Sequence, residues 1–500
     1  MFKGHPKGLF VLFFTEMWER FGFYTVLAIF VLYLQENFHW DAATVGNIYG
    51  LFIAATFFLP LFGGMVSDRL LGYGRTILVG ACTSGVGYAL LAIPTKEPAL
   101  LFTALCVIAI GNGLFKPNTY VLVGNLYSHA NGSLKDAAFN IFYMGINLGA
   151  FLGPIAAATT KKFMLTHFHV PLAQAYNAAF GVCAIGLAIS ITIFLTFRKH
   201  YRAADYRTKD STAPKEEITL TKSQERERIT ALLITFVIII FFWMAYYQNG
   251  FTLTLFAKNY TADKVDRLTY LLFDPVTLVS ILGLILCVTL AVRKTESVRS
   301  RLIGLCVAVA AAGVIVMKCV TFQPLNPISP ESYQSFNPMF IIFLTPMIIG
   351  FFGWLNRKRI EPSSPGKIGL GMFITAVSFT IMIFASIGLP APGATAASTF
   401  TRVNPYWLIS SYFVITLAEL FLSPMGISFV SKVAPPRMKG MMMGGWFAGQ
   451  AVGSYLAGYV GRFYVRLQLW QFFLILVFAA LISASLVLIF LKKLKHATTA

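Results

Sequence analysis

The sequence predicts an all-α, polytopic membrane protein, and three observations support this fold class. First, 57% of the 500 residues are apolar and 12% are charged, whereas an average soluble protein is about half apolar and about a quarter charged. Second, apolar runs of about twenty residues follow one another with little interruption, and each is long enough for a helix to cross a bilayer. Third, the net charge of +20 comes from basic residues in short loops between these runs. This distribution indicates membrane topology and no nucleic-acid partner.

Fourteen apolar segments are long enough to cross a bilayer. Six precede a long polar break and lie at 8–35, 43–66, 75–94, 98–123, 134–160 and 174–197. Eight follow it, at 229–258, 270–292, 299–321, 329–356, 366–388, 406–433, 437–461 and 468–492. The break, 198–228, is rich in Lys and Arg and has no apolar period, so it is predicted to be a solvated basic linker.

The basic residues also predict the orientation in the membrane. If the N-terminus is inside and the segments alternate, most of the 40 Lys and Arg residues lie on the cytoplasmic side, as the positive-inside rule requires. An even number of segments places the linker and the basic C-terminus on that same side. We therefore expect a multi-pass protein of the plasma (inner) membrane, surrounded by lipid, with both termini cytoplasmic.

Ionisable residues inside the first and fourth segments are the first candidates for function. The helical spacing of Glu16, Glu19 and Arg20 brings Glu16 and Arg20 within ion-pair reach on one face, which Tyr24 continues. Lys116 has a similar predicted depth, about 12 Å from the cytoplasmic side. A charge in the bilayer interior costs about 3 kcal/mol or more. We therefore expect these residues to meet and to carry function.

Polar residues of the other segments form a second group. Glu419 lies near the middle of 406–433, with no basic residue close to it in that segment. Asn147, Gln248 and Asn337 would each need a polar partner or a polar cavity. Such amides also hold membrane helices together without any further function. A single one of these amides could therefore either belong to a functional site or only hold two helices together.

The sequence argues against an ATP-driven pump and against a membrane-embedded enzyme. It contains no G-x-x-x-x-G-K-[ST] phosphate loop, and its seven His residues fall in loops or tails. Its six Cys residues lack metal-ligand spacing. What remains is passage of a solute driven by an ion gradient, because a carboxylate beside a cation can exchange a proton as that cation moves to another partner. No cofactor is expected, only protons as the coupling ion.

The loop between the second and third segments carries the first family signature. It reads G-G-M-V-S-D-R-L-L-G-Y-G-R and resembles the G-G-x-x-S-D-R-x-L-G-x-x-R motif of the major facilitator superfamily. Glycines permit a tight turn, and an aspartate can form ion pairs with arginines that hold neighbouring helices in one state. The predicted gating residues are Gly63, Gly64, Asp68, Arg69, Gly72 and Arg75.

Within that superfamily, the chain resembles the proton-dependent oligopeptide transporter family. Its first segment contains Glu16-x-x-Glu19-Arg20-Phe21-x-Phe23-Tyr24, similar to the motif E-x-x-E-R-F-x-Y-Y. The stretch 142–149 is similar to F-Y-x-x-I-N-x-G of the fifth helix, and 111–118 is similar to the fourth-helix stretch with the family's lysine. Residues 419–424 are similar to the tenth-helix motif E-x-x-x-S-P. The resemblance covers most of both halves of the chain.

This resemblance implies a fold, a function and a role for each candidate residue. The fold is the major facilitator fold of two six-helix bundles plus two extra helices, and the function is proton-coupled import of di- and tripeptides by alternating access. The proton-coupling residues would be Glu16, Glu19, Arg20 and Lys116. The substrate-binding residues would be Tyr24, Lys116, Asn147, Gln248, Asn337, Glu419 and Trp446. Lys116 would attract the peptide carboxylate, Glu419 the amino terminus, and Trp446 would line a side-chain pocket. The partners are short peptides and protons, and we expect a monomer.

The resemblance also predicts the domain organisation. Residues 1–197 would form the N-terminal bundle, 198–228 the cytoplasmic linker, and 229–500 the C-terminal bundle with an inserted helix pair near 270–321. We favour this position because 242–248 resembles the family's seventh helix and follows the linker directly. In the alternative, the inserted pair occupies 229–292 and Gln248 leaves the pocket.

Three positions depart from the family pattern. Members usually have tyrosines at the positions of Phe23 and Phe57 and an arginine at that of Leu27. Losing the arginine removes one anchor for a carboxylate, so Lys116 acts alone or the substrate differs from an ordinary peptide. Two alternatives follow: a proton-coupled symporter of another small zwitterion or organic anion, and a non-transporting membrane receptor with the same fold.

Overall fold

The computed structural model describes residues 4–127, 134–205, 221–292, 298–392, 400–435 and 438–499, and nearly all of them are helical. The first half contains α1 (Lys7–Phe38), α2 (Ala42–Phe58), α3 (Pro60–Val66), a π-helical turn (Ser67–Leu71), α4 (Tyr73–Leu91), α5 (Pro98–Asn125), α6 (Lys135–His167) and α7 (Leu172–Thr196). Two short 3-10 turns, Arg198–His200 and Arg202–Ala204, follow α7. The centre of the predicted linker, 206–220, lies outside the described residues.

The second half repeats this pattern with one helix pair more. It contains α8 (Lys222–Tyr246), α9 (Thr252–Asn259), α10 (Arg267–Tyr270), α11 (Pro275–Val292), α12 (Val298–Thr321), α13 (Phe336–Arg357), α14 (Ser364–Ser386), α15 (Tyr406–Val433), α16 (Lys439–Val460) and α17 (Leu469–Thr499). Further 3-10 turns cover Tyr247–Gly250, Pro330–Ser335 and Gly461–Val465. Two short strands, β1 (Lys264–Val265) and β2 (Asn326–Pro327), pair antiparallel beside α10.

The fold class predicted from the sequence is confirmed, because every predicted apolar segment coincides with helix. Within the described residues, eleven helices are long and apolar enough to cross a membrane. The other three segments correspond to α4, α11 and α16, which are helical as well. Glycines lower the hydropathy of α4 and α16, and they also let these helices approach their neighbours closely: a Cβ at Gly458 of α16 would lie 2.0 Å from the Gly46 carbonyl oxygen of α2.

Local sequence sets several helix ends. Asp41 precedes α2 and accepts a hydrogen bond of 3.1 Å from the Thr44 amide, an N-cap that satisfies a free backbone donor. Hydrogen bonds from Thr44 also hold the pKa of Asp41 below its usual value. Thr221 and Gln224 form a reciprocal capping box at the start of α8. The π-helical turn ends at Gly72, whose φ of 78° is a left-handed value that favours glycine.

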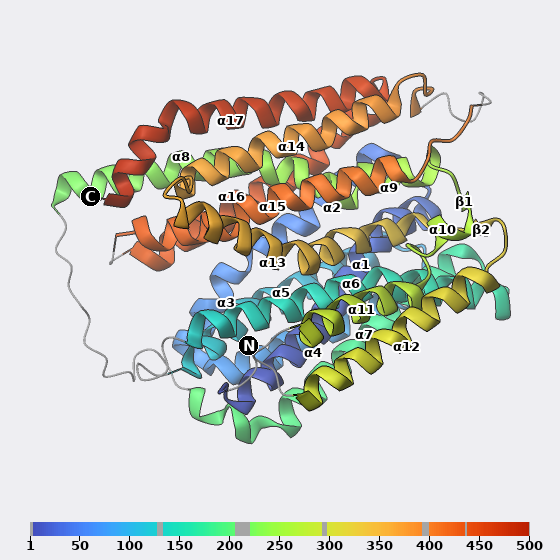
Figure 1. Cartoon of the computed structure of the whole chain (residues 1–500), viewed down its shortest axis with the longest axis horizontal. Coiled ribbons are helices and arrows are strands. Elements are labelled where there is room, and N and C mark those ends of the chain that lie inside the picture. The colour runs from blue at the N-terminus through green and yellow to red at the C-terminus, as the bar shows by residue number, and fades with distance from the viewer. Residues whose placement is uncertain are drawn as a thin grey trace.

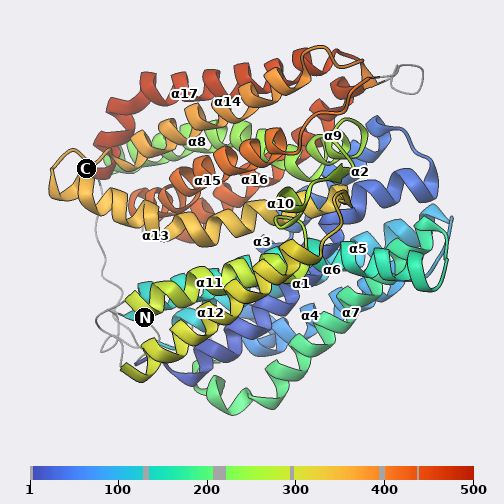
Figure 2. The same cartoon turned by 45° about the vertical axis from the view of Figure 1, so that its right-hand side comes forward.

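Two helical bundles lie side by side in both views (Figures 1 and 2). In the first, α1 packs on α6 and α7, and α4 packs on α5. In the second, α14 packs on α15 and α17, and α8 packs on α16 and α17. The helices α11 and α12 pack mainly on each other. Only 11% of the apolar stretch of α12 is buried inside the protein. We therefore propose that α11 and α12 are the inserted pair; residues 293–297 between them are outside the described part of the chain.

The bundles are joined at one end, where α1 and α6 finish and α13 begins. Here Lys161 of α6 forms an ion pair of 2.5 Å with Glu331, whose side chain is fully buried. The Ser335 hydroxyl donates to the Phe151 carbonyl (3.2 Å), and Arg462 donates to Asn47 (2.8 Å). The hydrogen bonds and ion pairs recorded between the bundles, within the described ranges, all lie at this end. The structure is therefore closed there.

The ion pair between Lys161 and Glu331 predicts a specific pattern of stability. Lys161→Ala leaves a buried carboxylate without a cation, which costs about 3–5 kcal/mol. We expect the single variant to lower the unfolding midpoint in detergent and to lengthen spin-label distances between the bundles at this end. Lys161→Ala combined with Glu331→Gln should recover most of the loss. Lys162→Ala, at the exposed neighbouring position, is the control. Equal stability of Lys161→Ala and Lys162→Ala would contradict the prediction.

Candidate functional site

The first half of the site is a buried ion cluster on α1. Glu16, Glu19 and Arg20 are 0%, 0% and 3% exposed. The Arg20 Nε atom lies 2.5 Å from a Glu19 carboxylate oxygen and 3.5 Å from a Glu16 oxygen. One guanidinium thus serves two carboxylates. The helical spacing seen in the sequence produces the contact with Glu16.

Helix α5 supplies further partners for this cluster. The Asn112 amide donates to Glu19 (3.3 Å), and the Thr119 hydroxyl donates to Glu16 (2.9 Å). Lys116 lies on the same helix, but its ammonium rests over the ring of Phe57 at 4.2 Å from the centroid. Among the described residues, no ion pair is recorded for Lys116. The structure therefore brings Lys116 to the cluster without pairing it with a carboxylate.

The position of α5 depends on two glycines and a proline. Pro117 lies inside α5, where a proline removes the helical hydrogen bond to the carbonyl four residues earlier, here that of Gly113. Gly63 of α3 packs directly on this carbonyl, since a Cβ at Gly63 would lie 2.0 Å from its oxygen. The first glycine of the gating motif therefore allows α3 to touch α5 next to Lys116.

The second half of the site surrounds Glu419 on α15. The amide of Asn337 on α13 donates to Glu419 (3.0 Å) and to the Thr416 hydroxyl (2.9 Å). The Tyr246 hydroxyl donates to the Asn337 carbonyl oxygen at 3.2 Å. Glu419 is 8% exposed, and no basic side chain pairs with it among the described residues. It is a buried carboxylate with hydrogen-bond donors and no cation, which a positively charged ligand can satisfy.

Tyrosines connect the two halves. Tyr24 of α1 lies close enough to both Arg20 and Glu419 to interact with their charges, and Tyr143 of α6 does so with Glu419. Tyr143 is still 36% exposed. The Asn147 amide donates to the Tyr143 carbonyl oxygen at 2.9 Å. Tyr24 and Tyr143 of the first bundle are therefore within electrostatic range of Glu419 of the second.

Two predicted substrate residues have structural contacts in this state. Gln248 is fully buried; its amide donates to the Ala457 carbonyl of α16 (3.0 Å), and its carbonyl oxygen accepts from Thr252 (2.8 Å). It therefore joins the end of α8 to α16. Trp446 of α16 lies against Gly426 of α15, where an added Cβ would be 1.9 Å from the indole ring. This ring is 2% exposed.

The rest of the gating motif forms the turn before α4. Asp68 accepts a hydrogen bond of 2.7 Å from Tyr73. In the described part of this loop, Asp68 has no recorded ion pair with Arg69 or Arg75, which are both exposed. The expected ionic latch is thus not among the ion pairs recorded for the described residues. Instead, the Gly74 amide donates to Asp205 after α7 at 2.9 Å.

Some residues of the site were not singled out by sequence reasoning. Tyr143 and Tyr246 stand inside the motif stretches 142–149 and 242–248, so the motifs contained the signal. Thr119 and Thr416 had no such signal, because a hydroxyl in a membrane helix usually bonds to its own backbone. Lys161 and Glu331 were overlooked because each stands near the end of its predicted segment.

Comparison with known proteins assigns the class. A sequence model of the Major Facilitator Superfamily matches residues 12–355, and a model described as POT family matches residues 316–473. The chain is 30% identical over 476 residues to the di-/tripeptide transporter of Lactococcus lactis subsp. lactis, covering 89% of this chain and 87% of that protein. It is 28% identical over 478 residues to dipeptide and tripeptide permease B of Xenorhabdus bovienii, covering 91% and 86%.

Solved structures agree with this class. The crystal structure of a mutant of the peptide transporter POT in complex with alafosfalin matches with a TM-score of 0.76 at 26% identity, covering 100% of this chain and 97% of that one. The fold and the site define a polytopic transporter of the major facilitator type, not an enzyme. The chain belongs to the POT family.

The contact between Gly63 and Gly113 predicts a difference between adjacent glycines. Gly63→Ala places a methyl group against a backbone carbonyl, so we expect a loss of about 1–3 kcal/mol in stability. Gly64→Ala is the matched control, because nothing lies within 4 Å of its added Cβ. It should be neutral or stabilising by up to about 1 kcal/mol, the helix preference for alanine. Thermal unfolding of both variants in detergent measures the difference; equal losses would refute the contact.

Proposed function

We propose that the protein is a proton-coupled symporter that imports di- and tripeptides by alternating access. One observation carries the proposal: Lys116 of the first bundle, which lies 6.0 Å from the Phe447 ring of the second, and Glu419 of the second bundle both lack an ion-pair partner among the described residues. A peptide zwitterion would supply both partners, its carboxylate for Lys116 and its ammonium for Glu419. The relatives named as di- and tripeptide transporters support this substrate class.

Proton coupling would use the cluster of Glu16, Glu19 and Arg20. Arg20 contacts both carboxylates, so a change in its position alters the charge balance of the pair. A carboxylate that loses its cation in apolar surroundings takes up a proton more readily. We propose that protons bind here when the helices move and leave on the opposite side of the membrane.

The remaining site residues would orient the peptide. Tyr24, Asn147 and Asn337 would hydrogen-bond its backbone, and Trp446 would limit a side-chain pocket. Gln248 would act indirectly, because its amide holds α8 against α16. Alternating access would require the closed end to separate, including the pair of Lys161 and Glu331, while the gating residues Gly63, Gly64, Asp68, Arg69, Gly72 and Arg75 act at the other end.

We further propose a location in the plasma (inner) membrane with both termini cytoplasmic, on the distribution of basic residues. The ion pair of Lys161 and Glu331 would then belong to the extracellular side. Since one chain supplies both halves of the site, a monomer would be the transporting unit. The coupling ion would be the proton, with no resident cofactor.

Uptake into proteoliposomes tests the substrate. With an inward proton gradient, we expect labelled dialanine to accumulate above its external concentration, and a protonophore should abolish this accumulation. Amino acids and organic acids serve as competitors, because Phe23, Leu27 and Phe57 leave room for another zwitterion or anion. No uptake across a broad dipeptide panel would reject peptide transport, and strong competition by an amino acid would favour the alternative substrate.

Glu19→Gln separates a symporter from a receptor with the same fold. Removing one carboxylate of the coupling cluster should cut gradient-driven accumulation at least about tenfold, as expected when one essential acid–base group is lost. Dialanine binding, measured by thermal shift, should remain. Glu97→Gln, at an exposed position before α5, controls for the substitution itself. If neither wild type nor variant responds to the gradient while both bind, the receptor interpretation is correct.

A further inference from the structure

The ammonium of Lys116 lies among aromatic rings. Its Nζ atom is 4.2 Å from the ring centroid of Phe57 and 6.0 Å from that of Phe447. Phe57 belongs to α2 in the first bundle, and Phe447 belongs to α16 in the second. The face of a phenyl ring attracts a cation electrostatically within about 6 Å. One cation is thus held between rings from both bundles.

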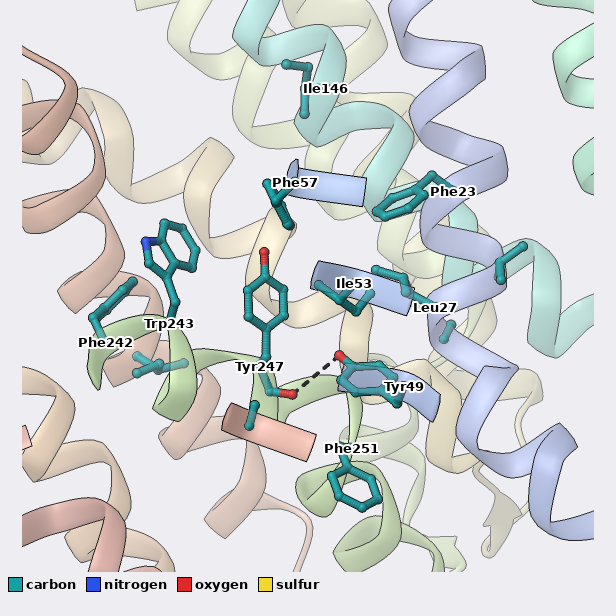
Figure 3. Close-up of a cluster of buried hydrophobic side chains, with 14 of the residues drawn as sticks. Phe23, Leu27, Tyr49, Ile53, Phe57, Ile146, Phe242, Trp243, Tyr247 and Phe251 are labelled. Atoms are coloured by element: carbon teal, nitrogen blue, oxygen red, sulfur yellow. Dashed lines mark hydrogen bonds between the residues drawn. The ribbon is translucent and has the colours of Figure 1, made fainter. Parts of the chain in front are cut away.

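The ring of Phe57 is itself fixed. It is 8% exposed and stands 5.9 Å from the ring of Tyr247 on the other bundle. Figure 3 shows Phe57 near the hydroxyl end of the Tyr247 ring, and the two ring planes are inclined by 53°. At the other end of Tyr247, the Tyr49 hydroxyl donates to the Tyr247 carbonyl at 3.3 Å. The Lys116 ammonium therefore contacts a ring whose position is fixed by packing.

The other cation of the site has a different environment. Arg20 also lies over a ring, that of Phe23 at 5.0 Å, but it has two carboxylates as well. Glu16 Oε1 is buried and accepts no recorded hydrogen bond, and the Arg20 Nε atom, its ion-pair partner, is 3.5 Å away, so this oxygen could still accept a hydrogen bond from Lys116. Without the Phe57 ring, the Lys116 ammonium would lose its cation–π contact, and an ion pair with Glu16 would become its most favourable contact.

We propose that Phe57 is a positioning residue that keeps the Lys116 ammonium apart from Glu16 and available to the carboxylate of the substrate. This inference rests on the proposed peptide transport. A cation–π contact is worth about 2 kcal/mol or less, so a carboxylate that reaches Lys116 can displace it from the ring. An ion pair with Glu16 would be a stronger competitor, and the substrate would lose its anchor.

The first test compares dialanine with dialanine amide, which lacks the carboxylate. For Phe57→Leu we expect KM for dialanine to rise about tenfold, in line with the loss of a desolvated cation–π contact, while KM for the amide and kcat for both substrates stay unchanged. Phe57→Tyr keeps the ring and should stay within about twofold of wild type. Phe52→Leu removes another buried ring of α2 and should not change the ratio of the two KM values. An equal rise for both substrates with Phe57→Leu would overturn the proposal, since a structural defect would act on both.

The second test is independent of any substrate. Ligand-free structures of wild type and Phe57→Leu in nanodiscs should show Lys116 over the ring in wild type and within about 4 Å of Glu16, ion-pair distance, in the variant. If the Lys116 side chain keeps its position in the variant, the positioning role is wrong. If it moves as expected but the wild type transports no peptide, the proposed function fails while the role of Phe57 stands.

Discussion

The burial of Arg20 between two carboxylates is the interaction on which the rest of the site depends. Charges at this depth are tolerated only when they are paired and hydrogen-bonded. Glu16 and Glu19 form ion pairs with Arg20, and Thr119 and Asn112 of α5 each donate a hydrogen bond to one of these carboxylates. This network holds α5 against α1. Helix α5 also carries the second cation of the site, Lys116, which rests over the Phe57 ring with no ion pair recorded among the described residues.

The division of charge between the bundles follows from the same constraint. Lys116, which is partly buried, stands in one bundle, and Glu419, which is buried, stands in the other. Neither has an ion pair recorded among the described residues. Bringing the two together through a zwitterion lowers the cost of both, and it does so only when both bundles contact the same ligand. In the proposed alternating access, the closed end with the pair of Lys161 and Glu331 would have to separate as one bundle moves relative to the other. In this proposal, the placement of Lys116 and Glu419 in different bundles links the binding of the zwitterion to the movement of the two bundles.

Much of this arrangement could be predicted from the sequence, because the bilayer imposes segment length and makes buried charge conspicuous. The helices and the contact of Glu16 with Arg20 followed from these rules. The ring under Lys116 did not, because it depends on the rotation of α2 and on the presence of Pro117 inside α5. The contact of the Gln248 amide with the Ala457 carbonyl of α16 did not follow from the sequence either. Contacts between helices need packing information that a segment pattern lacks.

The departures at Phe23, Leu27 and Phe57 form one pattern in three dimensions. The two phenylalanines supply the rings beneath Arg20 and Lys116, and Leu27 is a buried apolar side chain beside them. A ring without a hydroxyl offers a cation its face and no hydrogen bond, so it holds the cation weakly. With no arginine at position 27, the proposed function would leave a single weakly held lysine, Lys116, to recognise the anionic end of the ligand. The affinity for the ligand would then depend on how easily the Lys116 ammonium leaves the Phe57 ring.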